Sequence, residues 1–423
     1  MISITSIEKG NEAAFAASLR GRAGKVNEEI QAAAADILEK VRTQGYPFVE
    51  AFSIERDGAA PRELSKAELE GAKNRCSKEL IASLELAADN IRNYQSRLVP
   101  KSQIWETENG VLGQLVRGLE RVGIYVPGGV AAYPSSVLMN AVPAKVAGVE
   151  ELIMFTPPTK YLNDAVMAAA LIAGVDRVIA IGGPLAVAAA AYGAGFIPKV
   201  DKLVGPGNAY VTAAKRLAFG LFDIDMTAGP SEVLVIADDS ADPVWVAADL
   251  LSQAEHDPLA AAVLVTDSKA LAERVQKELD AQLSKLSRRE IAEASINDYG
   301  AIVLCPDLNA AVRLANEIAP EHLEIMTEKP EELMLLIKNA GAIFLGSSSP
   351  EPLGDYLAGP SHVLPTSGTA RFFSPVSVET FIKRTSLIGC TREALKKYSE
   401  DIIRLAESEG LDAHANSIRV RFK

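Results

Sequence analysis

The chain has 423 residues, of which 48% are hydrophobic and 23% charged, and its formal net charge is -12. This length allows two or three domains with large cores. The acidic balance, without a long basic run, disfavours a nucleic acid or an anionic membrane as the partner.

The first third is predicted to be mainly helical, with long helices near 27–43 and 66–97 and a short strand around 111–116. From residue 121 onward, short apolar strands alternate with helices. In the first series the strands are 121–126, 151–155, 177–181 and 202–205, and the helices are 134–148, 162–173, 184–194 and 208–218. In the second series the strands are 232–237, 261–266, 301–305 and 342–346, and the helices are 243–256, 268–284 and 308–318. A helical tail is predicted at 391–408.

Strands this apolar suit a parallel sheet that is covered on both faces, and their alternation with helices indicates βαβ units. We therefore predict an α/β protein with two doubly wound, Rossmann-like parallel-sheet domains and helical N- and C-terminal segments. The predicted parts are an N-terminal segment 1–20, a first α/β domain made of 21–120 and 235–370, a second α/β domain 121–234, and a C-terminal segment 371–423. The dinucleotide fingerprint G-x-G-x-x-G is missing, because GPGNAY (205–210) and YGAGFIP (192–198) both lack the third glycine.

The location is predicted from what the sequence lacks. No apolar run reaches the ~18 residues of a membrane span. The N-terminus also lacks the basic and apolar regions of a secretory signal. Three widely spaced cysteines, Cys76, Cys305 and Cys390, argue against a disulfide framework, and we interpret all three as packing residues. We therefore expect a cytoplasmic protein.

Histidine is the commonest metal ligand and titrates near neutral pH, and the chain has only four histidines. Gln253 and His256 are three residues apart near a predicted helix end, so they share a face and could hold one metal ion. A polar helix end, with His256 favoured by the helix dipole, is the alternative.

The pair Glu321 and His322 could supply two proton acceptors. Adjacent residues on a regular strand point to opposite faces, so both could serve one site only if the backbone after Pro320 is irregular. The alternative is a solvated glutamate beside a packed histidine. Asp355 and His362 flank a loop whose spacing predicts no geometry.

Two further features complete the set of candidates. Glu409 and His414 lie almost at the C-terminus, where polar residues are usually just exposed to solvent. Gly- and Pro-rich segments follow or end predicted strands at 124–129, 181–184, 204–208 and 228–232. Their position suggests that a ligand lines one edge of the predicted sheet.

Taken together and in order, several segments resemble the histidinol dehydrogenase family. They are GIYVPGGVAAYPSSVLMNAVPAKVAGV, KVDKLVGPGNAYVTAAK, DMTAGPSEVLVIAD, LLSQAEHDP, APEHLEI, GDYLAGPSHVLPTSGTARF and EGLDAHANSIRVR. The resemblance runs from about residue 20 to the end. It implies the NAD-linked oxidation of L-histidinol through L-histidinal to L-histidine, the last steps of histidine biosynthesis. It also implies one zinc ion per subunit, NAD as cofactor and a cytoplasmic homodimer.

The resemblance assigns a role to each matching position. It implies zinc ligands at Gln253, His256, Asp355 and His414, and catalytic proton acceptors at Glu321 and His322. The implied substrate contacts are Ser231, His362 and Glu409 together with His322 and the four zinc ligands, and the implied NAD contacts are Tyr125 and Asn208. The final segment, 371–423, would cross to the partner, so that Glu409 and His414 complete the neighbouring active site.

One position departs from the family, which usually reads IGGAQA where this chain has IGGPLA (181–186). The family's glutamine contacts the dinucleotide, whereas Leu185 cannot form that hydrogen bond, and one such bond is worth only about 0.5–1.5 kcal/mol. Three alternatives stay open: a related zinc- and NAD-dependent dehydrogenase of another small primary alcohol, a zinc hydrolase, or a binding protein without catalysis.

Overall fold

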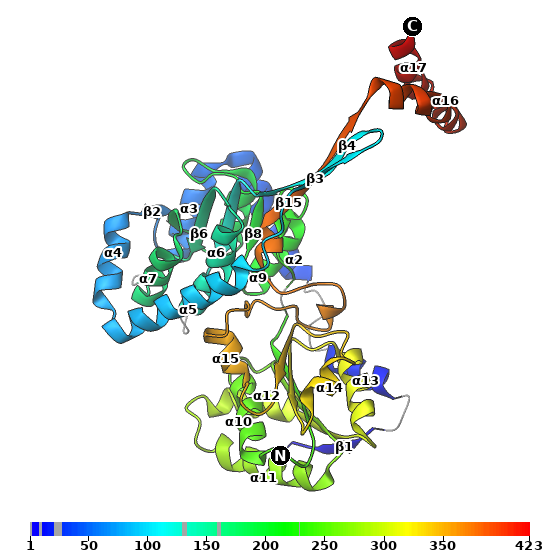
Figure 1. The fold of residues 1–423 in the computed structure, drawn as a ribbon. Coiled ribbons are helices and arrows are strands. Elements are labelled where there is room, and N and C mark those ends of the chain that lie inside the picture. The colour runs from blue at the N-terminus through cyan, green and yellow to red at the C-terminus, as the bar shows by residue number, and fades with distance from the viewer. Residues whose placement is uncertain (1, 8–10, 21–27, 129–132, 159–161, 228) are drawn as a thin grey trace. The chain divides into compact units, whose positions relative to one another are not determined.

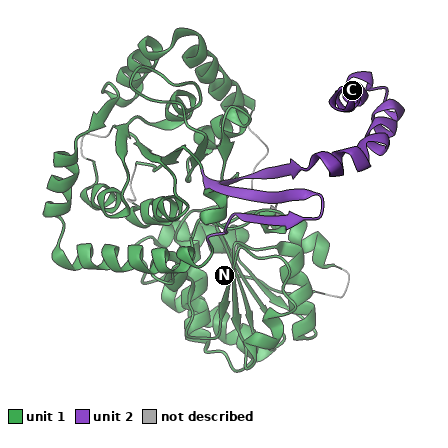
Figure 2. Ribbon diagram, turned by 45° about the horizontal axis from the view of Figure 1, so that its top comes forward, with its two compact units in different colours: residues 1–98, 119–381 green, residues 99–118, 382–423 purple. Residues whose placement is uncertain are grey.

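The computed structural model describes residues 2–7, 11–20, 28–128, 133–158, 162–227 and 229–423. The chain forms two compact units, which Figure 2 shows in different colours. Unit 1 contains residues 1–98 and 119–381, and unit 2 contains residues 99–118 and 382–423. None of the described helices is long and apolar enough to cross a membrane.

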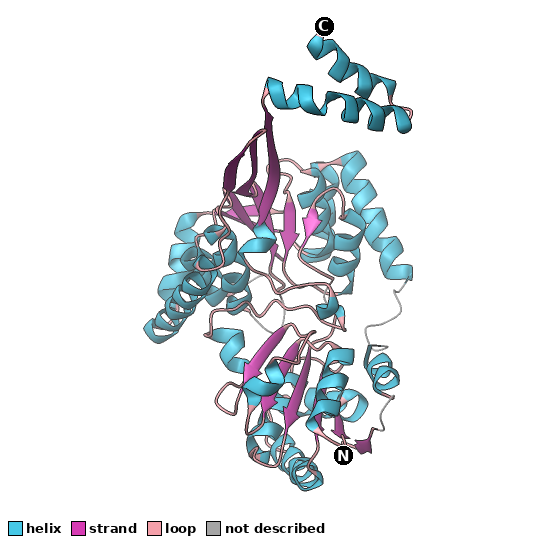
Figure 3. Ribbon diagram, turned by 45° about the vertical axis from the view of Figure 1, so that its right-hand side comes forward, coloured by secondary structure: helices cyan, strands magenta, loops and turns pink. Residues whose placement is uncertain are grey.

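The first sheet of unit 1, called sheet A here, has six parallel strands in the order β1-β12-β11-β10-β13-β14. The strands are β1 (Ile4–Ser6), β10 (Glu232–Ala237), β11 (Ala261–Thr266), β12 (Ala301–Leu304), β13 (His322–Met326) and β14 (Ala342–Leu345). The helices are α1 (Glu12–Arg20), α10 (Pro243–Ala254), α11 (Lys269–Leu283), α12 (Arg289–Tyr299), α13 (Leu308–Ile318) and α14 (Pro330–Met334). One face packs on α10, α11 and α12 and the other on α1 and α13, which explains why the strands are apolar throughout (Figure 3).

The second sheet of unit 1, sheet B, has the order β2-β7-β6-β5-β8-β9, in which only β2 is antiparallel to its neighbour. The strands are β2 (Arg62–Leu64), β5 (Arg121–Tyr125), β6 (Glu151–Thr156), β7 (Arg177–Ala180), β8 (Lys202–Val204) and β9 (Asp223–Ile224). The helices between them are α6 (Pro134–Val146), α7 (Asp164–Ala173), α8 (Gly183–Tyr192) and α9 (Ala209–Ala218). The strand order reverses between β5 and β8, and such a switch point is where doubly wound sheets bind ligands.

The N-terminal helices cover sheet B, as the ribbon shows (Figure 1). They are α2 (Glu28–Gln44), α3 (Tyr46–Asp57), α4 (Lys66–Arg75) and α5 (Lys78–Ser96). Helix α2 packs on α8 and α9, α4 packs on α7, and α5 packs on α6. The helical part of 21–120 shares its core with 121–234, whereas the predicted first domain groups it with 235–370. The segment 1–20 is likewise not separate, since β1 pairs with β12 in sheet A.

The last part of unit 1 follows β14 and is mostly loop. It contains the short helix α15 (Glu351–Tyr356) and the 3₁₀ turns η2 (Thr369–Arg371) and η3 (Val378–Phe381). This stretch ends where unit 2 begins again at Ile382.

Unit 2 is a three-stranded antiparallel sheet followed by two helices. The strands, in the order β15-β4-β3, are β15 (Ile382–Cys390), β4 (Gly110–Gly118) and β3 (Gln103–Thr107). The helices are α16 (Arg392–Ser408) and α17 (Asp412–Arg419), with a final turn η4 (Val420–Phe422). Large apolar side chains are exposed in this unit, including Ile388 at 78% and Leu405 at 66%.

Candidate active site

The pair Glu321 and His322 lies where α13 gives way to β13. Ala319 adopts a left-handed conformation (φ 54°) at the end of α13 and is followed by Pro320, so the chain enters β13 irregularly. Both side chains of the pair are buried and both face Glu232, at the start of β10. The irregular backbone that the sequence required for a shared site is therefore present.

Hydrogen bonds to Glu232 fix the roles of the side-chain atoms in this pair. Glu321 Oε2 accepts a hydrogen bond from Glu232 N at 2.9 Å. His322 Nδ1 lies 3.2 Å from the carbonyl oxygen of Glu232, which can only accept, so Nδ1 carries a proton. His322 Nε2 is buried and has no hydrogen-bond partner within the described residues. This nitrogen is thus the one available for chemistry.

His322 belongs to a group of three residues that could hold a cation, the carboxylate–histidine cluster of His322, Glu351 and Asp355. One ligand atom from each residue lies within 4.8 Å of the others, and His322 Nε2 is 3.6 Å from Asp355 Oδ1. Glu351 and Asp355 are one turn apart on α15, so their carboxylates share a face. Within the part of the chain that the structure describes, no other three His, Cys, Asp or Glu residues meet this condition.

The cluster brings two carboxyl groups and one imidazole together. Burial alone would lower the pKa of His322, but the neighbouring carboxylates Glu321, Asp355 and Glu351 outweigh it and raise this pKa to about 10. Burial raises the pKa of Glu321 to about 7 and, together with Asp355, that of Glu351 to about 8. Burial opposes ionisation of Asp355 as well, yet His322 and His362 lower its pKa to about 2. A buried site with this charge balance suits a divalent cation.

A second layer of buried polar side chains supports the cluster. Glu324 lies two residues after His322, and its Oε1 accepts a hydrogen bond from Glu351 N at 2.8 Å. Ser252 donates to Glu351 Oε2 at 3.0 Å. Burial, and then the neighbouring Asp249, raise the pKa of Glu324 to about 9. These contacts tie β13, α10 and α15 together.

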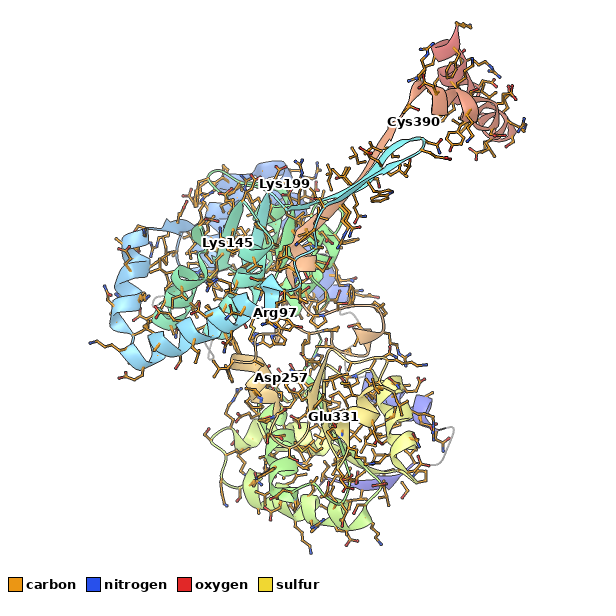
Figure 4. All side chains as sticks on the ribbon, viewed as in Figure 1. Arg97, Lys145, Lys199, Asp257, Glu331 and Cys390 are labelled. Atoms are coloured by element: carbon orange, nitrogen blue, oxygen red, sulfur yellow. The ribbon has the colours of Figure 1, made fainter. Side chains whose placement is uncertain are left out.

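Gln253 and His256 lie side by side at the end of α10, as their spacing predicted. Gln253 Nε2 is 3.4 Å from His256 Nδ1, and the buried Gln253 Oε1 lacks a hydrogen-bond partner among the described residues. His256 Nδ1 is 3.0 Å from the Ser252 carbonyl oxygen, which leaves Nε2 as the nitrogen with a free lone pair. Figure 4 labels Asp257, the next residue, on the loop that leaves this helix.

His362 has a partner for each ring nitrogen. Its Nδ1 is 2.9 Å from the Asp355 carbonyl oxygen, and its Nε2 is 3.2 Å from Ser136 Oγ on α6. Burial lowers its pKa, so the neutral ring donates through Nδ1 and accepts through Nε2. His362 therefore links α6 to the backbone of Asp355. A cavity opens here, lined by His322, Asp355 and His362 and by apolar walls that include Phe344 and Leu364.

The predicted NAD contacts lie at the switch point of sheet B. Tyr125 ends β5, is only 3% exposed, and its hydroxyl accepts a hydrogen bond from Gly183 N at 3.0 Å. Asn208 precedes α9, and its Oδ1 caps the first amides of that helix. Leu185 is 2% exposed and packs in the core of sheet B. Of the Gly- and Pro-rich loops, Gly129 and Ala228 lie outside the described residues.

The remaining predicted residues fall elsewhere. Ser231 immediately precedes β10, and its carbonyl oxygen accepts from Ala261 N at 3.0 Å. Glu409 and His414 belong to unit 2, where Glu409 ends α16 and His414 lies in α17, and both are exposed. Of the four predicted zinc ligands, only Asp355 belongs to the carboxylate–histidine cluster.

Glu351 is not among the site residues predicted from the sequence. The one signal in the sequence was the spacing of Glu351 and Asp355 in EPLGD, because carboxylates four residues apart share one face if the segment is helical. The sequence-based prediction places Asp355 beside a loop and contains no helix at 351–356, so it does not use this spacing.

Two doubly wound sheets and a buried pair of proton acceptors beside a candidate cation site are features of an α/β enzyme. The model of the histidinol dehydrogenase family matches residues 20–422, and the chain belongs to this family. It is 50% identical to a histidinol dehydrogenase of Clostridium acetobutylicum, covering 96% of this chain and 95% of that one. It is 49% identical to one of Syntrophotalea carbinolica, with full coverage of both. A crystal structure of histidinol dehydrogenase from Elizabethkingia anophelis matches with a TM-score of 0.93 and 35% identity, covering 100% of this chain and 98% of that one. The predicted α/β fold is confirmed.

Proposed function

We propose that this chain oxidises L-histidinol through L-histidinal to L-histidine, the last steps of histidine biosynthesis, in a reaction that uses two NAD and one zinc ion per subunit. The observation that carries the proposal is the buried Glu321–His322 pair, whose free Nε2 faces Asp355. The relatives that share about half of its residues over nearly the whole chain bear the name of this activity.

The two proton acceptors divide the work of the reaction. As hydride leaves the alcohol carbon for the nicotinamide, His322 Nε2 takes the hydroxyl proton, while its Nδ1–H stays bonded to the Glu232 carbonyl. The aldehyde is then hydrated, and Glu321 takes the proton of the attacking water. A pKa of about 7 suits Glu321 to give and take protons near neutral pH. The hydrate gives up the second hydride, and the carboxylic acid is formed.

Zinc fits the residues present. The buried Gln253 Oε1 has no hydrogen-bond partner within the described residues, and oxygen and imidazole nitrogen are ligands that zinc accepts. The proposed ligands are Gln253, His256, Asp355 and His414. When bound, zinc would anchor the imidazole and amine of the substrate and offset the charge of the carboxylates. With that charge offset, His322 need not hold its proton and can act as the base.

The cofactor and the partner are also part of this proposal. The switch point between β5 and β8, with Tyr125 and Asn208, would hold NAD. The exposed apolar side chains of unit 2 suit burial in a homodimer. We expect Glu409 and His414 of unit 2 to complete the site of a second copy of the chain. Besides Glu409, the residues Ser231 and His362 would contact the substrate together with the ligands of the zinc. We expect this enzyme to work in the cytoplasm.

The test is NADH formation by purified, zinc-loaded protein supplied with L-histidinol and NAD. We expect two NADH for each L-histidinol consumed. Treatment with a chelator should abolish NADH formation and L-histidinol consumption in parallel. His322→Asn should slow NADH formation in a single turnover from alcohol, whereas Glu321→Gln should mainly slow oxidation of supplied aldehyde. Product without NADH would favour a zinc hydrolase, and faster turnover of another small alcohol would favour a related dehydrogenase.

A further inference from the structure

A buried ion pair lies beneath the loop that joins β8 to α9. Lys215 Nζ on α9 is 2.5 Å from Asp225 Oδ1, just after β9, and the two side chains are only 6% and 2% exposed. Moving two charges out of water carries a large desolvation cost, and well-packed apolar residues are often no less stabilising. Stability alone therefore does not explain why this ion pair is buried here, and its other contacts suggest a further role.

Both members of the pair bind the backbone of a single residue, Gly205. Asp225 Oδ2 accepts a hydrogen bond from Gly205 N at 2.8 Å, and Lys215 Nζ donates to Gly205 O at 2.9 Å. Gly205 adopts φ +104°, a conformation that L side chains rarely reach, and a Cβ there would collide with the carbonyl oxygen of Tyr125. Gly205 is thus held between the ion pair on one side and the end of β5 on the other.

Gly205 starts the loop 205–208, which crosses the switch point of sheet B. Pro206 and Gly207 are half-buried, and Asn208 is exposed and begins α9. A loop at this place presents its backbone and the start of a helix to a bound dinucleotide. The charged groups of Lys215 and Asp225 are themselves buried, so they act through the loop.

We propose that the Lys215–Asp225 ion pair positions the 205–208 loop for NAD and thereby sets the affinity for the cofactor. The inference rests on the proposed function, because that function places NAD at Tyr125 and Asn208. Lys215 and Asp225 are positioning residues and do not contact NAD. Their removal weakens cofactor binding and leaves L-histidinol binding, which depends on the proposed zinc ligands and substrate contacts, close to unchanged.

The chain offers a matched control in Lys202, another largely buried lysine, which begins β8. Lys202 Nζ is 2.7 Å from Asp223 Oδ2, and the side chains are 11% and 53% exposed. Lys202 lies at the start of β8 and Asp223 at the start of β9, at the opposite end of these strands from Gly205, and no hydrogen bond joins Lys202 to the 205–208 loop among the described residues. Lys202→Met therefore removes a lysine–aspartate pair without releasing the loop.

The experiment compares Lys215→Met and Lys202→Met in the full-length, zinc-loaded protein. NADH and L-histidinol affinities are measured separately by calorimetry, with KM for each substrate as a second readout. We expect Lys215→Met to weaken NADH binding about tenfold or more, since hydrogen bonds to charged groups are the strong ones. Its L-histidinol affinity and zinc content should stay within about twofold of wild type, and Lys202→Met should change none of these.

Three results would overturn the inference: NADH affinity that is unchanged in Lys215→Met, an equal loss of both affinities, or an equal loss in Lys202→Met. If Lys215→Met does not fold, Asp225→Asn provides the test, because it keeps one acceptor and should give a smaller loss confined to NADH. Failure of the proposed function is a separate outcome, since wild-type protein would then bind no NADH or would not turn over L-histidinol.

Discussion

Hybrid dimers test whether unit 2 of one chain completes the active site in unit 1 of another. The proposal places His322 and His414 of the same site on different chains, so His322→Asn and His414→Ala should each abolish activity alone. In a hybrid with one lesion on each chain, both lesions fall in the same composite site and the second site is intact. Because a symmetric dimer has two sites, such a hybrid should retain about half of wild-type activity. Random subunit exchange should give about a quarter, since half of the dimers are hybrids.

The matched control puts both lesions on one chain and pairs it with a wild-type chain. Each of the two sites then contains one lesion, so this hybrid should be inactive if unit 2 crosses over. The two hybrids can be made by co-expression of chains with different affinity tags and assayed by NADH absorbance. A site formed within one chain predicts the reverse pattern, with an inactive single-lesion hybrid and a half-active control. That reversal would refute the crossover.

Four further predictions concern the cluster, its supports and Glu321. Glu351→Gln should weaken zinc binding by about 10–100-fold, which is the range for groups that support a metal site. The affinity is measured by competition with a chelator, and an unchanged affinity would remove Glu351 from the site. Glu324→Leu should cost about 1–3 kcal/mol of stability because it leaves Glu351 N–H buried without a partner, whereas Glu324→Gln should keep that acceptor. The pKa of Glu324 in the folded state, about 9, exceeds its value of about 4.5 in the unfolded chain, so the wild type should lose stability as the pH rises between these values. Glu324→Gln should lose less stability over the same range. Equal losses of the two proteins in melting experiments would contradict this. Oxidation of supplied aldehyde should fall as pH drops below about 7, where Glu321 becomes protonated, and a flat profile in the wild type would argue against Glu321 as the base.

The regular α/β parts were predictable because their signal is local. The apolar runs 232–237 and 261–266 and the amphipathic helix 308–318 match the observed β10, β11 and α13 to the residue. The predicted helix 66–97 is broken at Cys76 and Ser77, where Ser77 caps α5, a start signal that the long helical pattern concealed. The helix α12 was missed because it buries only three of its residues.

Long-range pairing could not be predicted in the same way. Strand β15 is mostly exposed and pairs with β4, which lies more than 250 residues earlier in the chain. The helices α2–α5 carry apolar faces that fit either sheet in principle, and only the tertiary contacts assign them to sheet B.

Some features of the site were likewise predictable from local sequence patterns, whereas others depend on the tertiary structure. The pairing of Gln253 with His256 follows from helical spacing, and the irregular entry of β13 follows a proline that the sequence displays. The approach of Glu351 and Asp355 to His322 depends on how a loop after β14 folds back, which no local pattern encodes. Leu185 is buried in the core of sheet B.

The most direct test is anomalous scattering at the zinc edge from crystals of the zinc-loaded protein. The proposal predicts one zinc per chain, bound by Asp355, Gln253 and His256 of that chain and by His414 of a second copy. Zinc bound away from Asp355, or a His414 that approaches no zinc, would contradict it.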